Sequence, residues 1–294
     1  DDLADFVQEN SAAFSDYAGK ILCVCGDSIA KGRYVLPEEA FPAVAASAMG
    51  MTIKNFAVNS GGYTRSGAQQ VLTQINAAIA DSSFDNDDVG IFLLSAGVND
   101  INDGPNATTY AQAVRTAIST VKTNFPNARI IVTDYIQGNA GLTVNADVAS
   151  AYIVYNNIKG ACLLLGVECI DNAYAWGLSH ASWFTSTGPS PHGDAVNADV
   201  LHPNITGNQY YAYYLLQYIA GNKFLPYFAP APITAAELAA HTGQVCGCRV
   251  VNGNTAMYGY YDVTPPATPS SEITATLPQF MAGDSRAPYF ITAY

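Results

Sequence analysis

Val89-Gly-Ile-Phe-Leu-Leu-Ser-Ala96 is the stretch of sequence that decides the fold, because apolar residues fill almost its whole length. A strand that is buried on both faces of a parallel sheet has a continuous apolar sequence, whereas a strand with one solvated face alternates between apolar and polar residues. We therefore expect a central strand over 89–96. The polar segment that follows, Gly97-Val-Asn-Asp100, is expected to form a loop at the carboxyl end of that strand.

Strand-like and helix-like segments alternate on both sides of this run. Further strands are predicted over 20–25, 51–58, 128–134 and 167–170, and helices over 37–49, 67–80, 108–124, 145–165 and 204–219. This alternation predicts a five-stranded parallel sheet with right-handed crossovers and helices on both faces. Ligands bind such sheets at the carboxyl ends of the strands. The loops at that edge are expected to begin at Gly26, Asn59, Gly97, Tyr135 and Asp171.

The last quarter of the chain differs in character from the rest. Residues 222–294 are rich in Pro, Tyr and Thr and show little helical periodicity outside 234–241, so we expect a small β-rich appendage after a first domain over 1–221. Residues 171–203 form a long stretch rich in Trp, His, Ser and Pro. A connection of that length inside a compact domain is usually functional or disordered.

The composition excludes some classes of partner. The chain carries 24 acidic and 12 basic residues, a net charge of −12, and only 12% of its residues are charged. Such a surface repels phosphate backbones, so nucleic acid is not expected as a partner. No run reaches the roughly 18 apolar residues of a membrane span. The first residues lack the pattern of a signal peptide, although one removed earlier is compatible with this chain. We expect a secreted or cell-surface location, with a cytoplasmic one as the alternative; the oligomeric state is open.

The six cysteines are an even number, which is compatible with disulfides. Cys23 and Cys25, however, lie two residues apart on one face of a predicted strand, where their Cα atoms would be about 6.5–7 Å apart, at the edge of what a bridge tolerates. Cys246 and Cys248 would likewise close a very tight ring. Zinc binding by the two pairs is the alternative. Buried reduced thiols are the favoured interpretation.

Three short segments carry residues suited to chemistry, and each also has a simpler interpretation. Gly26-Asp-Ser-Ile29 places Ser28 directly after a strand, where a nucleophile would sit, but Asp-Ser also suits a helix cap. Asn99 can donate to a developing oxyanion, or it can simply form a turn with Asp100. In Asp199-Val-Leu-His-Pro203, a carboxylate precedes an imidazole closely enough to orient it, or His202 is an ordinary surface residue.

In combination the three segments point to one family. Gly26-Asp-Ser28, Gly97-Val-Asn-Asp100 and Asp199-Val-Leu-His-Pro203 occur in this order at expected strand ends, and together they resemble the SGNH, or GDSL-like, hydrolases over about residues 19–221. The resemblance implies a three-layer α/β/α sandwich of flavodoxin-like type, with residues 1–221 as the catalytic domain. The rival α/β-hydrolase fold is disfavoured, because Ser28 lacks the Gly-x-Ser-x-Gly context that it requires.

The resemblance also implies roles for individual residues. Ser28 corresponds to the nucleophile, and Asp199 and His202 complete the triad. Asn99 corresponds to a side-chain donor to the oxyanion, joined by the N–H groups of Ser28 and of Gly61, for which Ser60 and Gly62 are alternatives. Ile29 replaces the usual Leu of the first motif. The chemistry needs no metal or organic cofactor.

The expected substrate is a small acyl ester, favouring acetyl groups on a glycan. Its predicted binding residues are Asp27, Tyr135, Trp176 and His180. Two other functions remain as alternatives: a lipase or thioesterase acting on longer acyl chains, and a non-catalytic binding or structural module of a cell-surface or phage assembly. A second Gly-Asp-Ser, residues 283–285, lies beyond the predicted triad and is interpreted as a surface turn.

Overall fold

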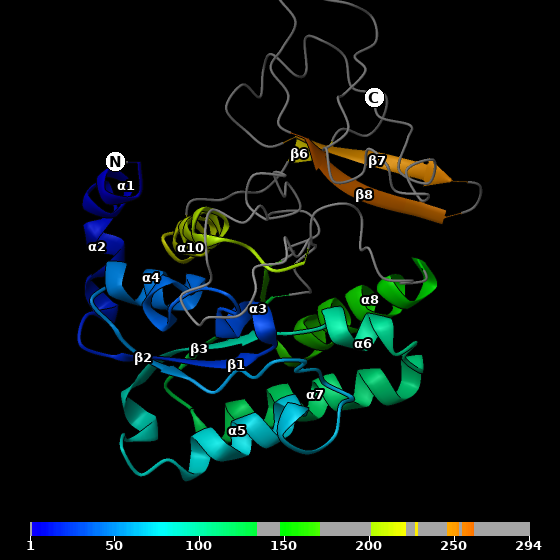
Figure 1. The fold of residues 1–294 in the computed structure, drawn as a ribbon, viewed down its shortest axis with the longest axis horizontal. Helices are drawn as coiled ribbons and strands as arrows, with labels where there is room; N and C mark the ends of the chain where they lie inside the picture. Colours follow the sequence, from blue (N-terminus) through cyan, green and yellow to red (C-terminus); the bar gives the residue numbers. More distant parts are fainter. Residues whose placement is uncertain are drawn as a thin grey trace, which may run out of the picture.

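The computed structural model describes residues 2–133, 148–170, 201–221, 227–228, 246–252 and 255–261. Its main body is a five-stranded parallel sheet in the order β2-β1-β3-β4-β5 (Figure 1). The strands are β1 (Ile21–Gly26), β2 (Thr52–Asn55), β3 (Val89–Ser95), β4 (Arg129–Thr133) and β5 (Glu168–Ile170). The predicted fold class is therefore confirmed.

Helices cover both faces of this sheet. Figure 1 shows α4 and α10 on one side of the sheet and α5 and α7 on the other, while α8 packs against α7. The longer helices are α4 (Phe41–Ala48), α5 (Val71–Ala80), α7 (Ala107–Asn124), α8 (Val148–Leu165) and α10 (Ile205–Ile219). None of the helices in the described ranges has both the length and the apolar sequence needed to cross a membrane.

The core forms because β1 and β3 are buried along their whole length. They pair in parallel, with Leu22 beside Ile91 and Val24 beside Leu93. Cys23 and Cys25 are free thiols within this layer, as the short spacing predicted, and burial raises the pKa of the Cys25 thiol. A strand pair enclosed on both faces removes much apolar surface from water, so the central strands fix the position of the loops at their ends.

The predicted helix over 37–49 begins later than expected. Residues Pro37–Glu39 form the short 3₁₀ helix η2, Ala40 is extended, and α4 starts only at Phe41. The reason is Pro42, which lacks an N–H and cannot lie in the interior of a helix that starts at residue 37. In the first turn of α4, by contrast, a proline costs no hydrogen bond.

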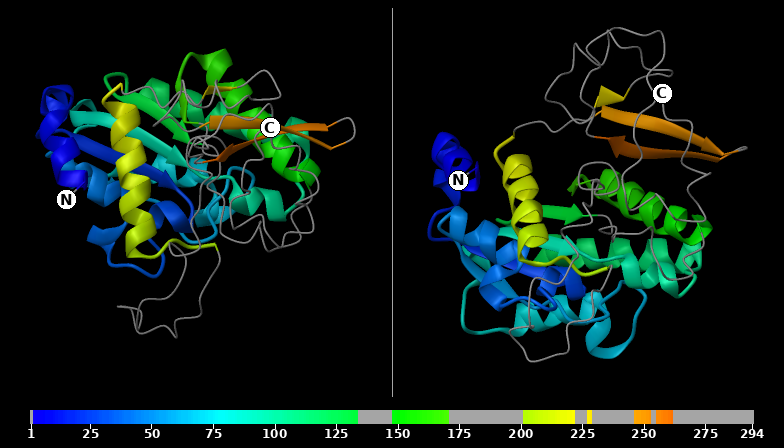
Figure 2. Two further views of the ribbon diagram at one scale, coloured as in Figure 1. Left: turned by 90° about the horizontal axis from the view of Figure 1, so that it is seen from above. Right: turned by 45° about the horizontal axis from the view of Figure 1, so that its top comes forward.

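Several short elements connect the sheet to its helices or precede it. They are α1 (Asp2–Glu9), α2 (Ser11–Phe14), η1 (Ser15–Tyr17), α3 (Ser28–Lys31), η3 (Gly67–Gln69), η4 (Asn86–Asp88) and α6 (Val98–Asn102). The N-terminal helix α1 lies beside α10 in both views of Figure 2, where the rings of Phe6 and Tyr213 have centroids 5.1 Å apart. Sequence analysis did not identify α1, α2 or α6.

The last part of the described chain is a separate three-stranded sheet. Strands β7 (Cys246–Asn252) and β8 (Thr255–Tyr261) form an antiparallel pair, and β6 (Tyr227–Phe228) runs parallel to β7. A β-rich appendage over 222–294 stays a prediction, since most of that range lies outside the described residues. The predicted helical segment 234–241 lies outside the described residues.

One arginine joins the far edge of the main sheet to the elements around it. Arg129 on β4 makes a two-pronged ion pair with Glu168 on β5, with both N–O distances 2.7 Å. Its third nitrogen donates to the hydroxyl of Tyr17 and to the carbonyl of Ile219, each at 3.0 Å. The planar guanidinium can reach all three partners at once, and a carbonyl at a helix C-terminus attracts a cation.

We predict that Arg129→Lys lowers the free energy of unfolding by about 1–3 kcal/mol, because an ammonium cannot replace the paired contacts to Glu168. Urea denaturation of both proteins measures this difference. Arg115→Lys on the exposed face of α7 is the control and should change stability by less than about 0.5 kcal/mol. Equal effects of the two substitutions would contradict the proposed role of Arg129.

Candidate active site

Ser28 is the first residue of α3 and directly follows β1 and Asp27. Asp27 caps this short helix, since its Oδ1 accepts hydrogen bonds from the N–H groups of Ile29 at 2.9 Å and Ala30 at 3.4 Å. The helix-cap interpretation of Gly-Asp-Ser is therefore confirmed for Asp27, and Ser28 follows it as the first residue of α3, where its role as a nucleophile stays a prediction. The N–H of Ser28 has no acceptor within the described part of the chain.

Ser28 contacts His202, which is 174 positions away in the sequence. Its Oγ lies 2.7 Å from Nε2 of His202, which is hydrogen-bonding distance, and both side chains are buried. A hydroxyl at this distance from an imidazole nitrogen can transfer its proton to that nitrogen. The structure thus brings together two of the three residues of the predicted triad. Asp199 lies outside the described residues, so its place beside His202 remains a prediction.

A buried asparagine holds the segment that carries His202. Asn208 on α10 donates to the carbonyls of Pro203 and Asn204, both at 3.0 Å, and its Oδ1 accepts from the N–H of Phe41 at 3.0 Å. The chain after His202 is thereby attached to the start of α4. Sequence analysis missed Asn208. Its helical spacing from the buried Tyr211 and Leu215 was the available signal, because it places a polar side chain on the apolar face.

The last residue of β1 is fixed by close contacts from two sides. Gln74 on α5 accepts from the N–H of Gly26 at 2.7 Å and donates to its carbonyl at 3.0 Å. A Cβ on Gly26 would lie 2.0 Å from the carbonyl oxygen of Ser95, and a Cβ on Gly61 would lie 2.1 Å from that of Gly26. Only glycine permits backbones to approach so closely. The strand end that carries Ser28 is therefore in fixed register with β3 and with the turn around Gly61.

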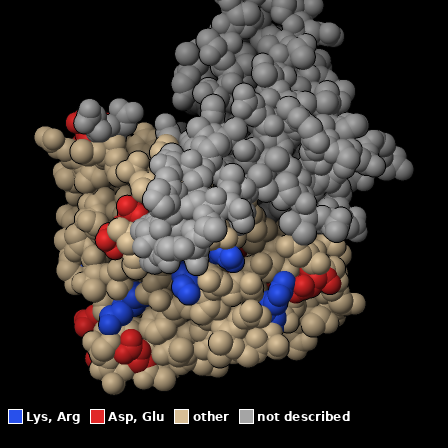
Figure 3. All heavy atoms as spheres, in the orientation of Figure 1, with Lys and Arg blue, Asp and Glu red and all other residues tan. Residues whose placement is uncertain are grey.

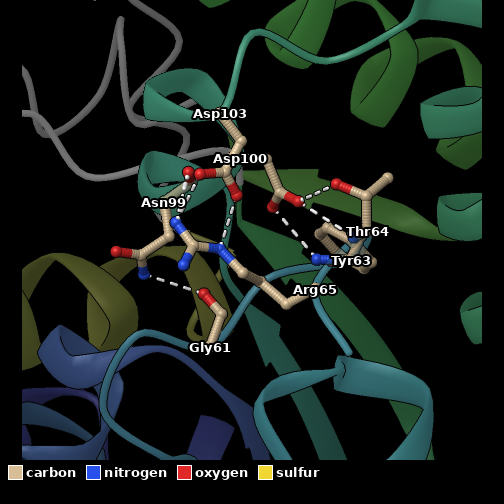
Figure 4. Close-up of polar contacts among 7 residues, drawn as sticks. All are labelled: Gly61, Tyr63, Thr64, Arg65, Asn99, Asp100 and Asp103. Carbon is tan, nitrogen blue, oxygen red and sulfur yellow. Dashed lines mark hydrogen bonds and ion pairs between the residues drawn. The ribbon is translucent and has the colours of Figure 1, made fainter. Parts of the chain in front are cut away.

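Asn99 and Gly61, both predicted to bind an oxyanion, are neighbours in the structure. The Asn99 Nδ2 donates to the carbonyl of Gly61 at 2.8 Å (Figure 4). An amide nitrogen carries two hydrogens, so one of them is left for another acceptor. The N–H of Gly61 itself donates to Val58 at 3.1 Å, and that of Gly62 to Gln69 at 3.0 Å. Either N–H would have to exchange its present acceptor in order to bind a substrate oxygen.

A second set of contacts fastens the segment after Gly61 to α6. The buried Asp100 accepts from the N–H of Tyr63 at 3.0 Å, and from the N–H and hydroxyl of Thr64 at 2.9 and 2.6 Å (Figure 4). Arg65 donates to the carbonyl of Asn99 at 3.0 Å and forms an ion pair with Asp103 at 2.6 Å. Sequence analysis gave Asp100 only a role in a turn. These contacts instead make it the residue that orders the loop beside Asn99.

The two buried carboxyl groups of the site are held in an environment that disfavours charge. Burial is the main cause that raises the pKa of Asp27 to about 7, against the hydrogen bonds from Ile29 and Ala30, which lower it. The negative charge of Asp100 adds to the increase. Burial also raises the pKa of Asp100, against its bonds from Thr64 and Tyr63. Desolvation penalises an ionised carboxylate even where it accepts several hydrogen bonds.

The remaining predicted site residues have different outcomes. Asp27, predicted to bind substrate, is 2% exposed and its carboxylate caps α3, so a direct contact with substrate remains a prediction. Tyr135, Trp176 and His180 lie outside the described residues. Within the described ranges, no group of three or more His, Cys, Asp or Glu side chains is arranged to hold a metal ion.

Comparison with known proteins gives a family for most of this body. Residues 24–210 match the family model described as the GDSL-like Lipase/Acylhydrolase family, which confirms the resemblance found in the sequence. A search of curated protein sequences gave no significant match.

The solved structures that are similar to this chain are distant from it in sequence. The salicylyl-acyltransferase SsfX3 of a tetracycline biosynthetic pathway is 18% identical, with a TM-score of 0.54 over 71% of this chain and 56% of its own. A lipolytic protein of the G-D-S-L family from Veillonella parvula is 20% identical, with a TM-score of 0.47 over 67% of this chain and 97% of its own. The carbohydrate acetylesterase Est24 from Sinorhizobium meliloti is 13% identical, with a TM-score of 0.49 over 69% and 99%.

We predict that Asp27→Asn gains stability relative to the wild type as the pH rises from about 4 to 7. The unfolded Asp27 ionises near pH 3.9, whereas burial keeps the folded carboxyl protonated until about pH 7. Because the folded pKa is raised, the contribution of Asp27 is complete below the unfolded pKa and is lost through this window. The substitution removes that loss while keeping a capping oxygen. The change can reach about 4 kcal/mol.

Urea denaturation at several pH values measures this change. Asp85→Asn is the matched control, since Asp85 caps the 3₁₀ helix η4 in the same manner but is exposed. It should alter stability by no more than about 0.5 kcal/mol at each pH. A stability difference between Asp27→Asn and the wild type that stays constant from pH 4 to 8 would show that burial of Asp27 has no such effect.

Proposed function

The chain belongs to the GDSL-like lipase/acylhydrolase family, and from this premise we propose that it is a serine esterase that hydrolyses small acyl esters. The family accounts for hydrolysis of the esterase or lipase type. The observation that carries the proposal for this chain is the 2.7 Å contact between Ser28 Oγ and His202 Nε2. A nucleophile and a base within hydrogen-bond reach are the minimum that acyl transfer through serine requires.

The proposed reaction has two steps. In the first, Ser28 Oγ attacks the ester carbonyl while His202 Nε2 takes its proton, and His202 then gives that proton to the departing alcohol. In the second, His202 takes a proton from water, which attacks the acyl carbonyl on Ser28. As the bond to Ser28 breaks, His202 returns that proton to Ser28 Oγ and the acid is released. Asp199 is proposed to orient His202 and to stabilise its charged form, as the carboxylate does in related triads.

The oxyanion of each step needs donors that are already in place. The N–H of Ser28 and the second hydrogen of the Asn99 amide are the proposed donors, since neither has another acceptor among the described residues. Gly61 remains the proposed source of a third donor, which requires its N–H to leave the carbonyl of Val58. Donors held rigidly in a buried site contribute most when charge develops, and the contacts around Asp100 supply that rigidity.

For the substrate, we propose acetyl or similarly short esters on carbohydrate. The support is a surface with few charges: 12% of residues are charged, and Figure 3 shows them as small separate groups on the visible face. Tyr135 and Trp176 remain proposed binding residues, because aromatic rings stack on sugar faces; Asp27 and His180 also remain proposed binding residues. Glycan esters are largely extracellular, which agrees with a secreted or cell-surface location. A lipase or thioesterase would instead need a broad apolar rim.

We predict that Ser28→Ala lowers the rate of p-nitrophenyl acetate hydrolysis by about 10⁴-fold or more, because the acyl-enzyme cannot form without the hydroxyl. Release of p-nitrophenol by the purified proteins measures the rate. Ser285→Ala is the matched control, since it alters the same tripeptide at its second occurrence, and it should keep the wild-type rate. Activity that survives in Ser28→Ala would contradict the proposed nucleophile. A wild type that is inactive over a broad pH range would favour the binding module.

A second prediction concerns the length of the acyl chain. Across p-nitrophenyl acetate, butyrate and dodecanoate, we expect kcat/KM to fall by roughly tenfold or more from the shortest to the longest, because a pocket shaped for acetyl excludes further methylenes. Acetate release from acetylated xylan and other acetylated glycans then tests whether the alcohol part of the ester is a carbohydrate. A rise of kcat/KM with chain length would instead support the lipase or thioesterase alternative.

A further inference from the structure

The loop after α3 holds an unusual backbone conformation next to the candidate nucleophile. Tyr34 has a φ of +71°, in the left-handed region that residues other than glycine seldom adopt. The loop is short and tightly bonded: Arg33 N–H donates to the carbonyl of Ser28 at 2.9 Å, and Val35 N–H to that of Gly32 at 3.2 Å. Such a conformation is unfavourable for a residue with a side chain and persists only where the surroundings enforce it.

This strained loop places an aromatic ring beside the candidate base. The ring of Tyr34 lies 5.4 Å from that of His202, at an angle of 89°, in an edge-to-face arrangement. The guanidinium carbon of Arg33 lies 4.8 Å from the centroid of the Tyr34 ring, within the range of a cation–π contact. Tyr34 is partly exposed and Arg33 is exposed. A charged group and an aromatic ring are therefore presented together, next to His202.

The role of His202 indicates which half of the substrate would reach this loop. In the proposed reaction, on which this inference rests, His202 Nε2 gives its proton to the oxygen of the departing alcohol. That oxygen must therefore approach His202, whereas the carbonyl oxygen points to the donors at Ser28 and Asn99. A residue in contact with the His202 ring is thus placed to touch the alcohol half of the ester and not its acyl half.

Arg33 shares with Arg115 an exposed side chain without an ion pair among the described residues, and it differs from Arg115 in lying over the ring that contacts His202. Arg65 is paired with Asp103 and Arg129 with Glu168. No carboxylate in the described part of the chain forms an ion pair with Arg33, although the whole chain has a net charge of −12. An exposed guanidinium held over an aromatic ring can pair with a carboxylate while the ring packs against an apolar or sugar face.

We propose that Arg33 and Tyr34 form the binding element for the alcohol half of the substrate, and that this alcohol is a ring compound carrying a carboxylate, such as an acidic sugar. Tyr34 packs against the ring of the alcohol and, through its contact with His202, also positions the imidazole. Arg33 pairs with the carboxylate. The element therefore selects esters by the charge of their leaving group.

Two esters with the same acyl group test this proposal: phenyl acetate, which is neutral, and 4-acetoxybenzoate, which carries a carboxylate on the leaving ring. The quantity compared is the ratio of kcat/KM for the anionic ester to that for the neutral ester, because intrinsic leaving-group differences cancel between variants. Arg33→Gln should lower this ratio by about two- to fivefold, as expected for a solvent-exposed ion pair. Raising the salt concentration should lower the wild-type ratio in the same direction.

Four further variants separate the effect of the Arg33 charge from that of the Tyr34 ring. Arg33→Lys should keep most of the wild-type ratio, and Arg115→Gln, which removes an exposed arginine from α7, should leave the ratio unchanged. Tyr34→Ala should raise KM more than it lowers kcat, and Tyr34→Phe should restore KM because it keeps the ring. A Tyr34→Phe variant as impaired as Tyr34→Ala would overturn the role of the ring.

The same measurements distinguish an incorrect binding element from an incorrect esterase function. A wild-type enzyme that hydrolyses both esters with a ratio insensitive to Arg33→Gln and to salt overturns the proposed binding element and leaves the esterase intact. A wild type that hydrolyses neither ester, with Ser28→Ala indistinguishable from it, overturns the esterase and the binding element with it. A reduced ratio in Arg33→Gln together with an unchanged ratio in Arg115→Gln supports the proposal.

Discussion

Gly26, the last residue of β1, has its backbone enclosed by three segments from elsewhere in the chain. Ser95 at the end of β3 approaches so closely that no Cβ fits on Gly26, and the turn at Gly61 is in similar contact from another direction. Gln74 satisfies both polar groups of Gly26 by hydrogen bonds. Ser28 follows two residues later, so any displacement of this strand end moves the proposed nucleophile. The geometry of the whole site depends on this close packing of backbone.

Burying the polar side chains around that strand end is unfavourable for stability, and each of these side chains holds a segment of the site in place. Burial disfavours the ionised forms of Asp27 and Asp100, as their raised pKa values show, and an unsatisfied Asn208 would be destabilising in the core. Each instead makes hydrogen bonds to backbone groups, and Asp100 also accepts one from the hydroxyl of Thr64. Asp27 presents Ser28, Asp100 orders the loop beside Asn99, and Asn208 holds the segment of His202. The unfavourable burial of these three side chains thus fixes the segments of Ser28, Asn99 and His202 relative to one another.

Much of the fold was predictable because its signals are local. The apolar run over 89–96 indicated a central buried strand, and β3 occupies 89–95. Gly-Asp-Ser after a strand placed Ser28 at a strand end, and the family motif indicated His202. Helix starts were less predictable, as Pro42 shows for α4. The partners of Gln74, Asn208, Asp100 and Tyr34 could not be predicted, because they lie far away in the sequence and no local pattern relates them.

The sequence by itself determined the family, the order of strands and helices, and the residue types available for acyl transfer, since each depends on periodicity or on a short motif. Only the tertiary structure decided that Ser28 and His202 are 2.7 Å apart, that Asn99 is bonded to Gly61, and that Tyr34 lies against His202. The physical reason is that these contacts join residues 38 to 174 positions apart. Their distances are set by how the sheet and its helices pack, and not by any property of the segments taken alone.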